Sequence, residues 1–280
     1  MIELTNLCFA YKNKAPLFDR LSLKITEGNI YGLLGKNGAG KTTLLKIICG
    51  LLFPQQGSCD VLGFTPQKRY ADMLKDIYFI PEEFYTPALK INEYVFLYAP
   101  FYPHFDPRAF ENYIATFDLP TNEQLTSLSY GQKKKFLIAF GLATNSRLLI
   151  LDEPTNGLDI PSKSQFRKLL AAAMDDNRTI IISTHQVRDI GNLIDPIIIL
   201  DNGKIIFNQT TESISRKLSV TLQKTEPDAA NALYSEKTLG GYVVINENRG
   251  EADSNLDIEL LFNAVINNQQ HMGKLFTREA

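Results

Sequence analysis

The chain has 280 residues, 44% of them hydrophobic and 21% charged, and its 29 Lys and Arg against 31 Asp and Glu leave a net charge of −2. This composition is typical of a globular protein with a buried core and excludes a disordered, collagen-like or disulfide-stabilised chain. The near-neutral charge gives no basic field for nucleic acid, and three scattered cysteines indicate a reducing compartment. We therefore expect a cytosolic protein with no nucleic-acid partner, no signal peptide and no membrane-spanning run.

Apolar segments predict strands separated by helices. Ile2–Leu4 and Leu21–Ile25 belong to segments that alternate apolar and polar residues, as half-buried strands do. Ile30–Leu34 is a continuous apolar run, and a helix is expected over Leu44–Cys49, ended by Gly50. The later apolar runs of strand length are Ile77–Ile80, Leu148–Leu151, Thr179–Ile182 and Ile197–Leu200. This alternation predicts an α/β fold with a largely parallel sheet.

Three further features divide the chain. The stretch from about residue 83 to 145 lacks strand-like runs and predicts a helical insertion with proline-containing turns. Asn202-Gly203 between two apolar runs predicts a β-hairpin, since a type I′ turn needs positive φ at both central residues. Beyond Thr211, a strand-like Tyr242–Ile245 and an amphipathic helix over Ile258–Val265 predict a small α+β appendage. We expect a main domain over residues 1–210 and an accessory domain over 211–280.

A glycine-rich stretch with the pattern G-x-x-x-x-G-K-[ST] follows the strand that ends at Leu34 and precedes a helix. Such a loop lets backbone N–H groups surround phosphate oxygens, while Lys41 reaches the β- and γ-phosphates and Thr42 ligates Mg²⁺. The residues expected to bind nucleotide here are Gly35, Lys36, Asn37, Gly38, Ala39, Gly40, Lys41, Thr42 and Thr43.

A second apolar strand ends in two carboxylates, Asp152 and Glu153. Carboxylates at the carboxyl end of a parallel strand lie where open α/β sheets bind ligands. A lone acidic strand end is often only solvated, but beside a phosphate-binding loop the pair predicts a metal ligand in Asp152 and a water-polarising base in Glu153.

The segment Leu128-Ser129-Tyr130-Gly131-Gln132, followed by three lysines, is less specific by itself. In isolation it reads as a helix capped by Ser129, with the lysines forming a solvated face. His104 lies among aromatic residues without metal-ligand spacing, and we interpret it as a surface or packing residue.

Taken in order, the phosphate loop, LSYGQ, LLILDEPTNGLD and STHQ resemble the ATP-binding subunit of an ABC (ATP-binding cassette) transporter, over about residues 2–207. The resemblance implies a RecA-like P-loop core with N-terminal antiparallel strands and an inserted helical subdomain at about 83–145. It also implies Mg²⁺-dependent ATP hydrolysis by a cassette dimer, homodimeric or heterodimeric. In such a dimer each ATP lies between the phosphate loop of one chain and the LSYGQ segment, the family's signature, of the other.

The same resemblance assigns residues outside the phosphate loop. Tyr11 would stack on adenine, and His185 would sense the γ-phosphate. The signature residues Ser129, Gly131 and Gln132 would contact the partner's nucleotide, and Asp159 would lie at the dimer interface. The cassette would sit on the cytoplasmic side of the membrane, bound to a separate transmembrane subunit.

Two positions depart from the family's pattern. Glu82 stands where transporter subunits usually carry Gln, and as an oxygen ligand it would still serve the metal, beside Thr42 and Asp152. Tyr130 stands where the signature usually has Gly. The tail and the Pro-Glu-Glu loop make the chain more similar to single-cassette exporter subunits than to importers. A soluble ABC ATPase acting on a macromolecular machine and a non-hydrolysing subunit are the alternatives. The resemblance leaves open the transported substrate, the membrane subunit and the role of residues 211–280.

Overall fold

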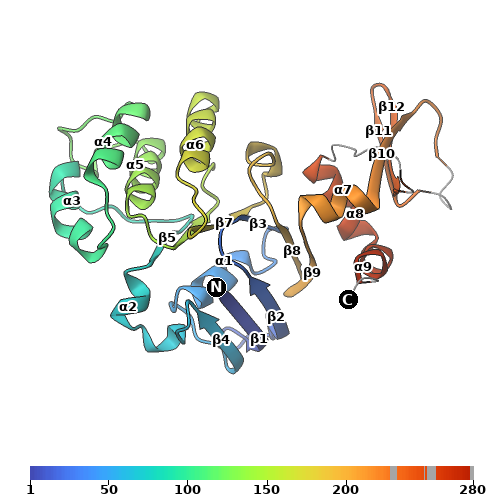
Figure 1. Cartoon of the computed structure of the whole chain (residues 1–280), viewed down its shortest axis with the longest axis horizontal. Helices are drawn as coiled ribbons and strands as arrows, with labels where there is room; N and C mark the ends of the chain where they lie inside the picture. Colours follow the sequence, from blue (N-terminus) through green and yellow to red (C-terminus); the bar gives the residue numbers. More distant parts are fainter. Residues whose placement is uncertain (228–231, 249, 251–256, 278–280) are drawn as a thin grey trace.

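The computed structural model describes residues 1–227, 232–248, 250 and 257–277. Its centre is a six-stranded sheet in the order β5-β6-β7-β3-β8-β9, in which all neighbouring strands are parallel except the final antiparallel pair (Figure 1). The strands are β3 (Ile30–Leu34), β5 (Ile77–Ile80), β6 (Leu148–Asp152), β7 (Thr179–Thr184), β8 (Ile197–Asp201) and β9 (Lys204–Gln209). The predicted α/β class is confirmed.

The central strands are continuous apolar runs because both faces of the sheet are covered. Every residue of β3, β6 and β7 is buried. Successive side chains enter opposite cores: Leu149 and Leu151 belong to one hydrophobic cluster, and Leu148 and Ile150 belong to the other.

A second sheet covers one side of the core. It is antiparallel, in the order β2-β1-β4, and consists of β1 (Ile2–Phe9), β2 (Phe18–Ile25) and β4 (Gln56–Val61). The helix α1 (Lys41–Ile48) packs its apolar side chains in the same cluster, and it begins earlier than the Leu44 start predicted. Gly50, at φ 66°, follows the end of this helix as predicted. The strand β4 was not predicted, because four of its six residues are exposed and no apolar run marks it.

The region between Glu83 and Asn145 contains helices and no strand, as predicted, and it forms one end of the molecule (Figure 1). After the short α2 (Ala71–Leu74), its helices are α3 (Ile91–Tyr98), α4 (Pro107–Thr116) and α5 (Tyr130–Ala143). Asp106 caps α4 by accepting from two backbone N–H groups. Ser129 caps α5 through a capping box with Gln132, as the sequence indicated. Aromatic rings of Tyr94, Phe136 and Phe140 pack between these helices.

The hairpin between β8 and β9 has φ 45° at Asn202 and φ 73° at Gly203, which confirms the predicted turn. The chain then forms an appendage at the opposite end from α3–α5 (Figure 1). Its antiparallel sheet, in the order β10-β12-β11, comprises β10 (Leu218–Gln223), β11 (Tyr234–Thr238) and β12 (Gly241–Glu247). Its helices are α7 (Thr211–Lys217), α8 (Ile258–Asn267) and α9 (Gln269–Thr277).

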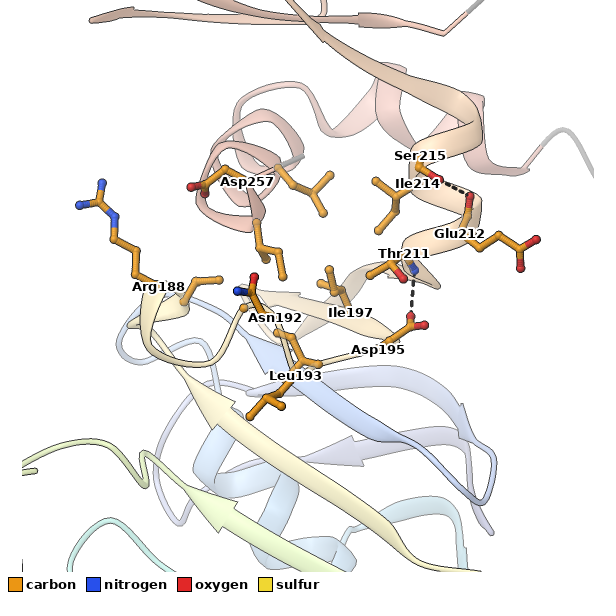
Figure 2. Close-up of a pocket in the computed structure, with 15 residues that line it drawn as sticks. Arg188, Asn192, Leu193, Asp195, Ile197, Thr211, Glu212, Ile214, Ser215 and Asp257 are labelled. Atoms are coloured by element: carbon orange, nitrogen blue, oxygen red, sulfur yellow. Dashed lines mark hydrogen bonds between the residues drawn. The ribbon is translucent and has the colours of Figure 1, made fainter. Parts of the chain in front are cut away.

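The appendage meets the core across a large cavity of about 970 Å³ (Figure 2). The cavity lies between the loop that precedes β8, the helix α7 and the start of α8. At its edge the backbone N–H of Thr211 donates to the Asp195 carboxylate, at 2.8 Å. Arg188, just after β7, forms an ion pair with Glu259 of α8. Apolar packing joins the two regions as well: the Phe276 ring of α9 lies edge-to-face with Phe207 of β9, 5.0 Å between centroids.

Candidate nucleotide-binding site

Three neighbouring parallel strands bring the predicted motifs together. The sheet order places β6, β7 and β3 side by side, with Asp152 opposite Ser183 and Leu34 opposite Thr184. The carboxyl ends of parallel strands meet at one edge of the sheet, so residues more than a hundred positions apart become neighbours. The phosphate loop, the two carboxylates and His185 all follow directly from this edge.

The phosphate loop depends on glycine at two turns. Gly38 and Gly40 have φ of 80° and 108°, which L side chains rarely adopt. Lys41 follows as the first residue of α1 and is 7% exposed. Its Nζ donates to the carbonyl oxygens of Gly35 at 2.7 Å and Lys36 at 3.4 Å. The loop is thus a backbone cradle with one fixed cation above it, an arrangement suited to polyphosphate.

Beneath the loop, Thr42 and Asp152 present two hard oxygen ligands side by side. Thr42 Oγ1 donates to Asp152 Oδ2 at 2.7 Å, and Ser183 donates to the other oxygen of this fully buried carboxylate. Among the described residues there is no group of three or more His, Cys, Asp or Glu side chains placed to hold a metal ion. A hydroxyl and one carboxylate nevertheless fit Mg²⁺, which typically takes one or two protein ligands together with substrate phosphates and water.

Several neighbouring groups hold the side chain of Glu153 in place. It is 3% exposed, and its backbone has φ of 47°. Its carboxylate accepts from the His185 backbone N–H at 3.0 Å and from Thr184 Oγ1 at 3.1 Å. The His185 Nδ1 lies 2.7 Å from Glu153 Oε1, and the Lys41 ammonium lies 3.7 Å from the same atom. The carboxylate is therefore held in one orientation toward the phosphate loop.

Glu82 lies two residues after the end of β5. Its Oε1 accepts from Asn156 Nδ2 at 3.0 Å, and Asn156 Oδ1 accepts in turn from Gln186 Nε2 at 3.1 Å. The sequence did not indicate this series of hydrogen bonds, because Glu82, Asn156 and Gln186 belong to three segments that only the fold brings together. It holds the Glu82 carboxylate against the loop that follows β6.

The phosphate loop, Glu82, Glu153 and His185 line one open cavity of about 560 Å³, within the usual range for small-molecule sites, whereas the buried Asp152 does not line it. Tyr11 stands at its rim, 41% exposed, with its hydroxyl 2.9 Å from Thr43 Oγ1 and its ring edge-to-face with Phe9. An exposed ring held at its base is available to stack on a planar group. The cavity is lined by Tyr11, Lys14, Ala15, Pro16, Leu17, Lys36, Asn37, Gly38, Gly40, Lys41, Thr42, Thr43, Glu82, Glu153 and His185.

The LSYGQ residues lie elsewhere. Ser129, Gly131 and Gln132 are at the N-terminus of α5 and do not line the cavity of their own chain. Asp159 has a local role as the cap of α6 (Ile160–Ala172), where it accepts from the Ser162 N–H at 2.9 Å. The fold thus assembles the phosphate loop with Glu82, Glu153 and His185, and leaves the signature outside.

Lys134 corrects the interpretation that the three lysines form a solvated face. It is fully buried, and its Nζ donates to the backbone carbonyl of Glu153 at 2.8 Å. Burial lowers the pKa of Lys134, while the carboxylates of Glu82, Glu153 and Asp152 oppose that shift. The helical period could have predicted this burial, because Lys134 lies on the same helix face as Leu137, Ile138 and Gly141, which are all buried.

Comparison with known proteins agrees with this geometry. A family model described as ABC transporter matches residues 18–156. The chain is 33% identical over 211 residues to the bacitracin transport ATP-binding protein BcrA of Bacillus licheniformis, covering 74% of this chain and 68% of that protein. It is 32% identical over 212 residues to the SkfA peptide export ATP-binding protein SkfE of Bacillus subtilis (strain 168), covering 74% and 87%.

The fold has a solved counterpart as well. The dimeric structure of a post-hydrolysis state of the ATP-binding cassette MJ0796, bound to ADP and Pi, superimposes with a TM-score of 0.66. That match covers 75% of this chain and 98% of the other at 24% identity, so it speaks for the fold alone. The predicted RecA-like P-loop core is confirmed.

Proposed function

The chain belongs to the ABC transporter family as an ATP-hydrolysing subunit, and from this premise we propose that it hydrolyses Mg²⁺–ATP in the cavity between Tyr11 and Glu153 to drive an exporter. The adenine would stack on Tyr11, and the phosphates would lie in the cradle of residues 35–43. Glu153 would orient and polarise the attacking water, and His185 would face the γ-phosphate.

The observation that carries this proposal is the position of Glu153. Its carboxylate is buried, bonded by Thr184 and His185, and placed next to the Lys41 ammonium that faces the phosphate loop. A general base must be oriented toward the proton that it abstracts, and these hydrogen bonds fix that orientation. They also tie His185 to the same carboxylate, so a change at the γ-phosphate would reach both groups.

Thr42 and Asp152 would hold Mg²⁺, with Glu82 as a further oxygen ligand. When bound, the ion would offset the charge of the phosphates. Glu82 lines the cavity but is engaged with Asn156. Exchange of its carboxylate between the metal and Asn156 would make the loop from Pro81 to Phe84 sensitive to nucleotide.

The position of the signature supports a dimer. Ser129, Gly131 and Gln132 lie outside their own cavity, so a second cassette, of the same or a related chain, would supply these residues to each ATP. The dimeric MJ0796 cassette is a precedent in the same fold. Asp159, at the start of α6, would lie at the interface between the cassettes.

An apolar surface on the helical region supports a membrane partner. Tyr85, Phe96 and Phe101 are 85%, 80% and 68% exposed, in the loop before α3, in α3 and just after it. Exposed clusters of large apolar side chains mark sites of association. No helix of the described residues is long and apolar enough to cross a membrane. We assign this surface to a separate transmembrane subunit, with the cassette on the inner face of the cell membrane. The name of SkfE, a peptide export ATP-binding protein, favours the export of a peptide.

The variant Glu153→Gln tests the proposal. It keeps the size and the acceptor oxygen of the side chain but removes the base, so turnover should fall by roughly 10²–10⁴-fold while ATP binding persists. ATP should then hold the variant as a dimer on size-exclusion chromatography. Glu83→Gln, an exposed neighbour of Glu82, is the matched control and should hydrolyse ATP normally. Wild-type turnover in Glu153→Gln would refute the assignment.

A further inference from the structure

Lys134 holds a buried charge next to the proposed catalytic base. The residue is 0% exposed and forms no ion pair within the part of the chain that the structure describes. Its Nζ instead donates to the Glu153 carbonyl at 2.8 Å. Taking a cation out of water costs free energy unless its surroundings compensate, so a buried lysine in this place needs an explanation.

Two aromatic rings provide part of the compensation. The Lys134 Nζ lies 5.4 Å from the centroid of the Tyr130 ring and 5.9 Å from that of Phe84. The rings are stacked on each other, 5.2 Å apart and 20° from parallel. Ring faces attract an ammonium at these distances. The Tyr130 hydroxyl also donates to the Glu82 carbonyl at 2.9 Å, which ties the loop carrying Phe84 to α5. The ammonium is therefore kept at one place beneath Glu153.

The Glu153 backbone is in the left-handed region, at φ 47°, where a residue with a side chain is uncommon. Its carbonyl accepts from Lys134 and, at 3.3 Å, from the backbone N–H of Asn156. Such a conformation persists only where the surroundings hold it. Rotation of this peptide would move the Glu153 side chain away from the His185 N–H and Thr184 Oγ1 that aim its carboxylate.

We propose that Lys134 is a positioning residue for Glu153, and that Tyr130 and Phe84 hold its ammonium in place. This inference rests on the proposed role of Glu153 as the base. It also gives Tyr130 a function in its own chain, at the position where the family usually carries Gly.

The variant Lys134→Met tests the inference, because Met keeps an unbranched side chain of similar length and lacks the donor. We expect kcat to fall by about tenfold or more, since small displacements of a catalytic group are costly. Affinity for a fluorescent ATP analogue should stay within about twofold of wild type, because Lys134 does not line the cavity. A purely structural role would instead lower the melting temperature and affinity together. Lys133→Met, half-buried in the same helix, is the matched control.

The variant Glu153→Gln, measured alongside, separates this inference from the proposed function. If Glu153→Gln is slow and Lys134→Met keeps wild-type kcat, only the positioning role is overturned; wild-type kcat in both overturns both. The double variant should be no slower than Glu153→Gln alone, because groups that act as a unit are not additive. Should Lys134→Met fail to fold, Phe84→Leu decides: we expect a lower kcat with unchanged affinity, and unchanged kcat would overturn the inference.

Discussion

The cassette, up to Gln209, and the appendage that follows it differ in how completely the side chains of their strands are buried. In the cassette, every residue of β6 and β7 is buried, between covered faces of the sheet. In the appendage, four of the five residues of β11 are exposed, and the sheet has three strands. The well-packed strands therefore carry the proposed catalytic groups, which must be held within about 0.5 Å of the productive geometry.

The junction between the two regions is also informative. It contains the cavity of about 970 Å³ (Figure 2), an exposed ion pair and the contact of Phe276 with Phe207. Arg188 of the ion pair lies three residues after His185. A region with fewer buried side chains can open locally at a lower free energy than its neighbour. We therefore expect the appendage to open at a lower free energy than the cassette.

The largest expected effect compares two buried leucines. Leu142 of α5 is 0% exposed and Leu261 of α8 is 1% exposed, and Leu→Ala at such sites costs about 2–5 kcal/mol. Leu142→Ala should lower the melting temperature of the cassette, whereas Leu261→Ala should increase hydrogen exchange only in the appendage, in α8 and β10–β12.

The alkylation rates of two buried cysteines, Cys49 and Cys59, would show which region each substitution opens. Burial raises the pKa of Cys59 to about 12 and that of Cys49 further, so both thiols should resist alkylation at pH 8 until the cassette opens. Leu142→Ala should accelerate their labelling and Leu261→Ala should not. Equal acceleration by both variants would mean that cassette and appendage unfold as one unit.

Nucleotide affinity should depend on the cassette alone. Tyr11→Ala removes the ring expected to stack on adenine and should weaken ATP binding by roughly 1–3 kcal/mol. Tyr11→Phe loses only the contact with Thr43 and should bind nearly as wild type. Tyr234→Ala, which removes an aromatic ring of the appendage, is the control. Identical ATP titrations of wild type and Tyr11→Ala would contradict the stacking role.

A smaller effect concerns Mg²⁺. Glu82→Ala should raise the Mg²⁺ concentration for half-maximal ATPase activity by roughly three- to tenfold, as loss of one oxygen ligand or of its partner would. It should also reduce any stimulation of the ATPase by the proposed membrane subunit, and Glu82→Gln should restore much of both properties. Glu83→Ala is the neighbouring control. Unchanged Mg²⁺ dependence in Glu82→Ala would show that this carboxylate only bonds Asn156.

The smallest effect is expected at the junction itself. Arg188→Ala breaks the ion pair with Glu259, but the Arg188 side chain is 81% exposed, and exposed pairs contribute little. We expect an unchanged melting temperature and faster hydrogen exchange at the start of α8 at low ionic strength. A marked loss of ATPase activity would instead show that the appendage acts on the segment after His185.

Much of the cassette was predictable because its signals are local. Strands β3 and β5 appeared at their predicted bounds, since buried parallel strands are continuous apolar runs. The strands β4, β10 and β11 escaped prediction. Their backbones are ordered by pairing with β1 and β12, and β4 and β11 carry few buried side chains. Pairing with a distant strand leaves little trace in the residues of an edge strand.

The sequence by itself determined the chemistry: a phosphate loop needs Gly40, Lys41 and Thr42 in adjacent positions, and contiguous residues can be read directly. Only the tertiary structure decided which groups surround that chemistry. It showed that Lys134, expected on the surface, is a buried donor to the Glu153 carbonyl, and that Asn156 donates to Glu82. These contacts join segments 19 and 74 residues apart. Their energies depend on burial and distance, which are properties of the packed fold and not of neighbours along the chain.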